Sequence, residues 1–314
     1  MKALVTGGAG FIGSQLTNKL LELGHEVFVM DDLSNGSLDN IPNLPEENFY
    51  HRSIITPCES IFSIEKFDTV FHFAALPRVQ FSIAHPLESN MANVNGTLRM
   101  LDVAQRHGVK RFVYSSSSSA YGDQPTLPLK EDMKPNPMSP YALQKLTGEQ
   151  YAVLYNQIHG LETVCLRYFN VYGPTQRVDS AYAAAIPKFT EQALKGNAIT
   201  IFGDGEQTRD FTFIDDVVNA NIQAATLDLP EYGRVVNVGC NNQTSVNQIV
   251  DKISEVLGID VNRKYLDPVV ESKHTRADVT VLKEYLQYVP KVNFDEGIRI
   301  TVEGIKERFD FCKK

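Results

Sequence analysis

The chain has 314 residues, 43% of them hydrophobic, and its formal net charge at pH 7 is −8. This length and composition predict a globular protein of two domains, or of one domain with a large appendage. The acidic balance argues against a nucleic-acid partner, because no basic cluster interleaves with aromatic residues.

A glycine-rich turn follows the first predicted strand. Residues 2–6 form a short apolar run, and Gly7, Gly10 and Gly13 then lie three residues apart at the start of a predicted helix over 12–23. Without Cβ atoms, backbone N–H groups there can approach a pyrophosphate, whose charge a helix N-terminus stabilises. The spacing is one residue wider than the G-x-G-x-x-G fingerprint of dehydrogenases, so the triplet alone is a weak signal for a dinucleotide.

An acidic residue strengthens that signal. The second predicted strand, 26–30, ends at Asp31, eighteen residues after Gly13. The adenosine ribose hydroxyls of a dinucleotide arrive at this position, and the negative charge would repel the 2′-phosphate of NADP. The pattern favours NAD. The alternative is that residues 31–36 form only a polar turn.

The order of elements predicts the fold class. Up to about residue 170, β-branched runs alternate with helical patterns, which is typical of βαβ units and a parallel sheet. The expected strands are 2–6, 26–30, 68–73, 111–115 and 162–167, with helices at 12–23, 90–107 and 139–159. Beyond Asn170 the pattern becomes irregular, and the expected helices are 181–195, 215–227, 245–258 and 279–288.

We therefore predict an α/β protein with a doubly wound parallel sheet, a Rossmann fold, and a smaller C-terminal substrate-binding domain. Residues 1–170 are expected to form the first domain, to which 206–236 return, and 171–314 are expected to form most of the second.

The sequence gives no sign of a metal site, a disulfide framework or a membrane span. The four cysteines lack the C-x-x-C spacing of a zinc site and suggest no disulfide framework, so we expect reduced thiols and no metal. The first strand starts too early to leave room for a signal peptide, and no apolar run approaches the roughly 18 residues of a membrane span. We expect a cytoplasmic protein with no membrane partner.

The strongest candidates for acid–base chemistry lie on the predicted helix 139–159. Tyr141 and Lys145 are four residues apart and share one face, so the ammonium can lower the pKa of the phenol and make it a base. This helix follows a strand that ends in the run 115–119, five serines at the edge of the sheet where open α/β folds bind ligands. One serine can share a substrate proton with Tyr141. The alternative is a loop whose hydroxyls satisfy one another.

Eight motifs along the chain carry a family resemblance. They are the glycine turn, Asp31 with 33–36, 72–75, 95–97, the serine run ending at Tyr121-Gly122, Tyr141-x-x-x-Lys145, 167–174 and 203–210. All occur in this order in the extended short-chain dehydrogenase/reductases, and the chain resembles their nucleotide-sugar epimerases of the UDP-galactose 4-epimerase type over nearly its whole length. The resemblance implies bound NAD, a UDP-sugar substrate and a homodimer, joined through helices such as 90–107 and 139–159.

The resemblance also implies site residues. The catalytic set would be Ser117, Tyr141 and Lys145, with Ser118 as the alternative serine. Asn95 would support the wall that Phe73 and its neighbours form against NAD. The implied NAD contacts are Gly7, Gly10, Phe11, Ile12, Gly13, Asp31, Asp32, Asn35, Gly36, Ile54, Phe73, Ala74, Ala75, Asn95, Ser115, Tyr141, Lys145 and Tyr168. The implied substrate contacts are Ser117, Ser118, Asn170, Ala184, Ala185, Phe202, Arg209, Thr275 and Arg276.

Arg209 resembles the cation that binds the pyrophosphate of the sugar nucleotide, since a guanidinium can hold two oxygens at once. The alternative is an ion pair with Asp210. Two departures from the family stand out. The acid that contacts adenine in many members is replaced by Arg-Ser-Ile at 52–54, and the C-terminal Arg-x-Gly-Asp segment falls on 268–271, which has no arginine. Arg276 would then supply the missing charge.

The resemblance favours an epimerase over its neighbours. Dehydratases and decarboxylases of this type place an acid just before the Tyr-Gly pair, where this chain has Ala120. We expect Tyr141, as phenolate, to take the O4 proton while C4 passes a hydride to NAD, after which the keto sugar turns and takes the hydride back on its other face.

The expected substrates follow from two features. Thr275 stands where bulky residues exclude N-acetyl sugars in galactose-only members, and 180–187 resembles the N-acetylhexosamine branch. UDP-GlcNAc and UDP-GalNAc are therefore expected alongside UDP-Glc and UDP-Gal. The alternatives are a UDP-glucuronate 4-epimerase, another NAD-dependent nucleotide-sugar oxidoreductase, and a non-catalytic NAD-binding scaffold.

Overall fold

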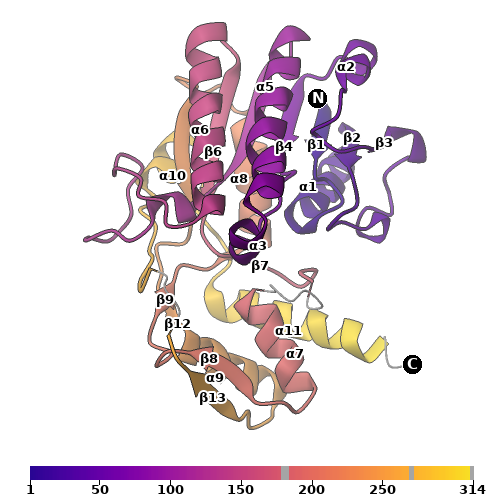
Figure 1. The fold of residues 1–314 in the computed structure, drawn as a ribbon. Helices are drawn as coiled ribbons and strands as arrows, with labels where there is room; N and C mark the ends of the chain where they lie inside the picture. Colours follow the sequence, from indigo (N-terminus) through magenta and orange to yellow (C-terminus); the bar gives the residue numbers. More distant parts are fainter. Residues whose placement is uncertain (178–183, 269–271, 312–314) are drawn as a thin grey trace.

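A seven-stranded parallel sheet forms the centre of the molecule (Figure 1). The computed structural model describes residues 1–177, 184–268 and 272–311. The strands, in the order in which they lie side by side, are β11 (Arg234–Val238), β6 (Glu162–Tyr168), β5 (Arg111–Ser117), β4 (Thr69–His72), β1 (Lys2–Thr6), β2 (Glu26–Asp31) and β3 (Phe49–His51). The chain proceeds outward from β1 in both directions, so the predicted doubly wound sheet is confirmed.

Strand alternation divides the hydrophobic core between the two faces of the sheet. In β1, Ala3 and Val5 belong to one buried cluster and Leu4 belongs to the other, as a period of two requires. Helices α1 (Phe11–Glu22) and α8 (Ile214–Thr226) contribute to the first cluster. The second cluster is covered by α2 (Glu59–Glu65), α5 (Thr97–Arg106) and α6 (Pro140–His159), of which α5 and α6 lie side by side in Figure 1.

The ends of α6 follow from local sequence. The Ser139 side chain accepts a hydrogen bond from the Ala142 N–H at 3.1 Å, and Pro140 occupies the first turn, where its missing N–H costs nothing. Gly160 ends the helix in the left-handed conformation, with φ of 69°. This places Tyr141 in the first turn of α6, at the carboxyl edge of the sheet.

The predicted helix 90–107 is longer and less regular than expected. It begins as α4 (Pro86–Asn90), passes through a π-helical turn, η3 (Met91–Gly96), and continues as α5. The Thr97 hydroxyl donates to the Asn93 carbonyl at 2.8 Å and lies 3.0 Å from His72 Nε2. Such turns are frequent at functional sites, and this one faces the loop after β4.

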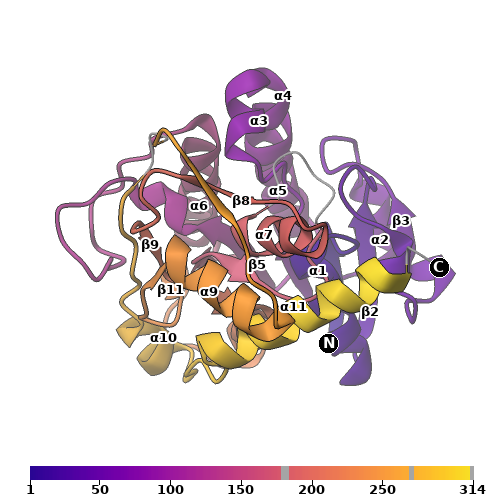
Figure 2. The same cartoon turned by 90° about the horizontal axis from the view of Figure 1, so that it is seen from below.

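Helices and short strands from the second half of the chain form a smaller layer below the carboxyl ends of the strands in Figure 1. Helices α7 (Ala185–Leu194), α9 (Val246–Leu257) and α11 (Phe294–Phe311) pack against one another, as Figure 2 shows. The smaller elements are β7 (Val171–Tyr172), β8 (Ile199–Phe202), β9 (Thr208–Arg209), β10 (Thr212–Phe213), β12 (Thr244–Ser245), β13 (Arg263–Leu266), α3 (Val79–Ala84), α10 (Thr280–Tyr285) and the 3-10 turns η1 (Leu38–Asn40), η2 (Glu46–Asn48) and η4 (Ser118–Tyr121). None of the described helices has both the length and the apolar composition that crossing a bilayer requires.

Candidate active site

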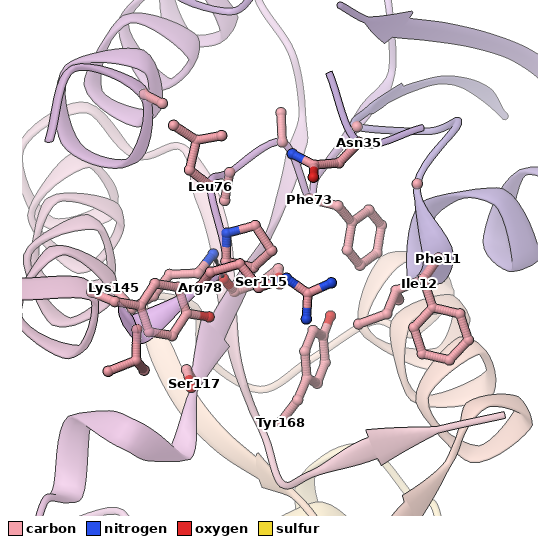
Figure 3. Close-up of a pocket in the computed structure, with 18 of the residues that line it drawn as sticks. Phe11, Ile12, Asn35, Phe73, Leu76, Arg78, Ser115, Ser117, Lys145 and Tyr168 are labelled. Atoms are coloured by element: carbon pink, nitrogen blue, oxygen red, sulfur yellow. Dashed lines mark hydrogen bonds between the residues drawn. The ribbon is translucent and has the colours of Figure 1, made fainter. Parts of the chain in front are cut away.

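A large cavity opens at the carboxyl ends of the strands, where the chain direction divides between β1 and β4. Its volume is about 1600 Å³. Pockets for one small ligand usually measure roughly 300–1,000 Å³, so this one has room for two. In Figure 3, Phe11 and Ile12 of α1 lie on one side of the pocket, and Ser117 and Lys145 lie on the other.

Most of the residues predicted from the sequence line this cavity. They come from the glycine turn, the loops after β2 and β4, the end of β5, the start of α6 and the segments after β6. The predicted residues in its wall are Gly7, Gly10, Phe11, Ile12, Gly13, Asp31, Asp32, Asn35, Gly36, Ile54, Phe73, Ala74, Ala75, Ser115, Ser117, Ser118, Tyr141, Lys145, Tyr168, Asn170, Arg209 and Thr275.

The glycine turn has two distinct requirements for glycine. A Cβ on Gly13 would stand 2.2 Å from the Gly7 carbonyl oxygen, and a Cβ on Gly7, whose φ is 69°, would stand 2.6 Å from the Ala74 nitrogen. These two glycines are therefore needed for packing inside the protein itself. Gly10 is the N-cap residue of α1 and places no side-chain cap on the helix, so the first-turn N–H groups remain open to an anion in the cavity. The turn fits the pyrophosphate of a dinucleotide.

Asp31 belongs to a turn and to the cavity wall at once. One carboxylate oxygen accepts the Leu33 N–H at 2.8 Å, as in the polar turn considered above, and the other accepts the Ala9 N–H of the glycine turn at 3.0 Å. Only 7% of the residue is exposed, and burial raises the pKa of its carboxyl. Asp31 thus joins β2 to the glycine turn while it lines the cavity.

The wall after β4 is held by a different asparagine from the one predicted. Asn93 accepts the Leu76 N–H at 2.7 Å and donates to the Leu76 carbonyl at 3.1 Å, which fixes the loop that carries Phe73. Asn95, the predicted support, is exposed and accepts from Asn90 at 3.2 Å. Two helical positions separate Asn95 from Asn93, which rotates its side chain to the far side of the helix, away from the sheet.

The acid–base candidates meet at the end of β5. Ser117 neighbours the Tyr141 phenol, whose pKa it lowers, and the Ser117 oxygen accepts from the Ser119 hydroxyl at 2.9 Å. Lys145 donates from Nζ to the Ser115 carbonyl at 2.6 Å, and burial lowers the pKa of its ammonium to about 7. The serine run thus satisfies part of its own hydrogen bonding and still presents Ser117 to Tyr141.

The electrostatics of Tyr141 differ from the expectation. Burial raises the pKa of the phenol, while Ser117 and the charge of Arg78 lower it. Lys145 was expected to supply that positive charge, but its ammonium is directed to a backbone carbonyl instead. Arg78 was not predicted, although it stands three residues after Ala75 in the loop that lines the cavity after β4. Figure 3 shows it reaching into the middle of the pocket toward Tyr168.

We expect Arg78→Gln to move the acid limb of the pH–kcat/KM profile upward by about one pH unit, the equivalent of roughly 1.4 kcal/mol. The active form of a base is the deprotonated one, so removing a cation that favours the phenolate shifts activity to higher pH. Arg78→Lys keeps the charge and should retain the wild-type limb. A profile that Arg78→Gln leaves unchanged would show that Tyr141 does not depend on this cation.

Several predicted contacts are not part of the cavity wall. Ala184 and Ala185 stand at the start of α7, and Phe202 ends β8 with 40% of its surface exposed. Arg276 is not among the wall residues, although Thr275 beside it is, and the backbone carbonyl of Arg276 accepts the Leu129 N–H at 2.7 Å. Residues 180–183 and 269–271, which include parts of the two segments compared with the family, lie outside the described residues.

Arg209 lines the cavity. Asp210, its alternative ion-pair partner, accepts hydrogen bonds from backbone groups instead. The carboxylate of Asp210 is fully buried, and its two oxygens accept the N–H groups of Cys240 and Ala277, each at 2.9 Å. Asp210 therefore holds loops together. Among the described residues, the arginines in the cavity wall are Arg52, Arg78, Arg177 and Arg209, a set that suits ligands carrying pyrophosphate groups.

Comparison with known proteins agrees with this geometry. The model of the NAD dependent epimerase/dehydratase family matches residues 3–239. The chain belongs to this family. The resemblance seen in the sequence is thereby confirmed, and NAD is the cofactor.

Three solved structures are similar over nearly the whole chain. UDP-glucose 4-epimerase of Thermotoga maritima, solved with UDP-glucose, has a TM-score of 0.93 and 38% identity, covering 98% of this chain and 100% of that one. UDP-N-acetylglucosamine 4-epimerase of Methanobrevibacter ruminantium M1, solved with UDP-N-acetylmuramic acid, has a TM-score of 0.92 and 38% identity, covering 98% of each chain. UDP-glucuronic acid 4-epimerase of Bacillus cereus, solved with UDP-glucuronic acid and NAD, has a TM-score of 0.91 and 33% identity, covering 98% and 100%.

Proposed function

We propose that this chain is a UDP-sugar 4-epimerase that interconverts UDP-Glc with UDP-Gal and UDP-GlcNAc with UDP-GalNAc. One observation carries the proposal. Ser117, Tyr141 and Lys145 meet at the end of β5, in a cavity with room for a dinucleotide and a second ligand. The similarity to three 4-epimerases supports the same reaction class.

The side chains have distinct roles in this proposal. Tyr141 removes the proton from the sugar O4 and later returns it. Ser117 holds the O4 atom within hydrogen-bond distance of the phenol. Lys145 fixes the edge of β5 through the Ser115 carbonyl, and its other ammonium N–H groups would hold the cofactor ribose. When bound, NAD takes up the C4 hydride and gives it back, so no second redox substrate is needed.

The position of acidic groups favours epimerisation over elimination. Among the described residues, the acids in the cavity wall are Asp31, Asp32 and Glu88, which belong to the end of β2, the loop that follows it, and α4. Beside the serines stands Ala120, which is fully buried and cannot transfer a proton. Without a nearby acid in the described part of the chain to promote elimination, the keto sugar formed at this site is reduced again by hydride return from the cofactor.

Thr275 supports the inclusion of N-acetyl sugars. It lines the cavity, its N–H donates to the Thr208 carbonyl at 3.1 Å, and its buried hydroxyl has no hydrogen-bond partner among the described residues. A small side chain at this place leaves volume for an N-acetyl group. UDP-glucuronate is the second candidate, because the cationic Arg78 beside Tyr141 could pair with a carboxylate near C4.

The test is NMR of each UDP-sugar incubated with the enzyme in deuterated water. We expect UDP-Glc, UDP-Gal, UDP-GlcNAc and UDP-GalNAc to epimerise at C4 without deuterium entering the sugar, whereas an enolising enzyme would label C3 or C5. Thr275→Tyr should fill the extra space and lower turnover of UDP-GlcNAc and UDP-GalNAc by about tenfold or more. Thr275→Ser should keep the wild-type turnover of this pair. Conversion of UDP-glucuronate alone would replace this proposal by the second candidate.

We also propose a homodimer joined through α4, η3 and α6. Large apolar side chains are exposed on these elements, with Leu87 at 83% and Ile158 at 64% of their surface. Met91, Leu143 and Leu154 extend the same apolar surface. Several large apolar side chains exposed on neighbouring helices support an interaction site there. Sedimentation at the mass of one chain would contradict the dimer.

A further inference from the structure

A buried ion pair lies behind the catalytic serines. Glu149 of α6 and Arg167 of β6 expose only 4% and 3% of their side chains. The guanidinium holds the carboxylate through two bonds, from Nε to Oε2 at 2.8 Å and from Nη2 to Oε1 at 2.6 Å. The Ser116 hydroxyl donates to the same Oε2 at 2.8 Å, and the Tyr121 ring covers the guanidinium at 4.5 Å.

This pair stands in line with the acid–base residues. Tyr141, Lys145 and Glu149 follow one another at intervals of four on α6, so they share the face that packs against the sheet. Each meets one of the first three serines of the run 115–119. Ser117 neighbours the Tyr141 phenol and lowers its pKa, Lys145 donates to the Ser115 carbonyl, and Glu149 accepts from Ser116.

Strand pairing extends the connection to a third element. Ser116 of β5 lies directly beside Arg167 of β6 in the parallel register. One carboxylate, that of Glu149, is therefore bonded to both strands at once. A planar fork of two parallel hydrogen bonds defines direction as well as distance, which apolar packing between a helix and a sheet does not.

Stability alone does not account for such a pair. Removing two charges from water opposes their attraction, and apolar residues of similar volume often stabilise a core as well or better. Catalysis has a stricter need, because a displacement of about 1 Å at the reacting atoms can cost roughly 100-fold in rate. Glu149 lies two helical turns, about 12 Å, from Tyr141 along the same helix axis.

We propose that Glu149 is a positioning residue whose paired bonds to Arg167 and Ser116 set the rotation and axial placement of α6, and through them the contact between Tyr141 and Ser117. The kinetic consequence of this placement rests on the proposed function. Glu149 and Arg167 are assigned no contact with substrate or cofactor.

The experiment separates placement from stability with a double variant. Glu149→Gln leaves the Arg167 cation without its partner and should lower Tm strongly, which by itself proves little. Glu149→Met combined with Arg167→Met removes both charges and keeps much of the volume, so Tm should return close to the wild-type value. We expect this double variant to keep the wild-type NAD content and KM while kcat falls at least about tenfold. A double variant with wild-type kcat would overturn the proposal.

Milder changes cover the case in which the double variant fails to fold. Glu149→Asp keeps the charge on a shorter side chain and should draw α6 out of place, and Ser116→Ala deletes one bond of the set. Both should lower kcat with little change in KM. Wild-type kcat in both, with normal folding, would likewise overturn it.

A titration of Tyr141 needs no substrate and keeps this inference distinct from the proposed function. The near-ultraviolet phenolate absorbance of each variant is compared with that of the same variant carrying Tyr141→Phe. Displacement of Ser117 from the phenol should raise the pKa of Tyr141 in the double variant, because Ser117 lowers that pKa, while Arg78, the cation that acts on Tyr141, is unchanged. An unshifted titration would contradict the placement role even if the enzyme turned over no UDP-sugar.

Discussion

Tyr141→Phe is expected to lower kcat on UDP-sugars by about 10²- to 10⁴-fold, the usual contribution of a positioned acid–base group. The variant loses only the hydroxyl that neighbours Ser117, because the Tyr141 N–H donates to the Ser82 hydroxyl at 3.0 Å through the backbone. The fold and the NAD content should therefore stay at the wild-type level. Turnover is measured by NMR of the sugar signals over time.

Tyr155→Phe is the matched control, since Tyr155 lies on the same helix and outside the cavity wall. Its kcat should equal that of the wild type. If Tyr141→Phe retained wild-type turnover, the acid–base role would pass to another group and the proposed mechanism would be wrong.

Gly13→Ala is expected to abolish tight NAD binding and to destabilise the fold by about 1–3 kcal/mol or more, the cost of an unrelieved clash in a packed core. The new Cβ would stand 2.2 Å from the Gly7 carbonyl oxygen, and backbone cannot move aside as a flexible side chain can. The glycine turn would have to open, which would displace the N–H groups at the start of α1. Stability is measured by chemical denaturation, and NAD binding by titration of the cofactor-free protein.

Gly10→Ala is the comparison variant. Its Cβ would lie 3.2 Å from the Gly7 oxygen, so the fold should lose little stability, and any loss of affinity would reflect how closely NAD approaches the turn. Equal NAD affinity in Gly13→Ala and wild type would refute the requirement for glycine at position 13.

Local patterns account for most of the fold and for the main parts of the cavity. The alternation in β1, the cap at Ser139 and the end of α6 at Gly160 all depend on residues near one another in the chain. The glycine turn, Asp31 and the serine run come at strand ends, and parallel strands bring their carboxyl ends to one edge. Short elements such as β3 and the edge strand β11 lack a comparable local signal and were not predicted.

Predictions that depended on where a side chain points were less accurate. Asn95 and Asn93 differ by two positions, and only the turn of the helix decides that Asn93 bonds the loop after β4. The charge beside Tyr141 comes from Arg78 of another element, while Lys145 of its own helix bonds a carbonyl.

The amino-acid sequence by itself determined the doubly wound sheet, the glycine turn at its edge and the spacing of Tyr141 and Lys145, because each is a short-range pattern of backbone preference and periodicity. The tertiary structure alone decided which cation faces Tyr141 and that Glu149 is bonded to both β5 and β6. Those contacts join residues far apart in the chain. Their energies depend on burial and direction, which exist only once the helices have packed on the sheet.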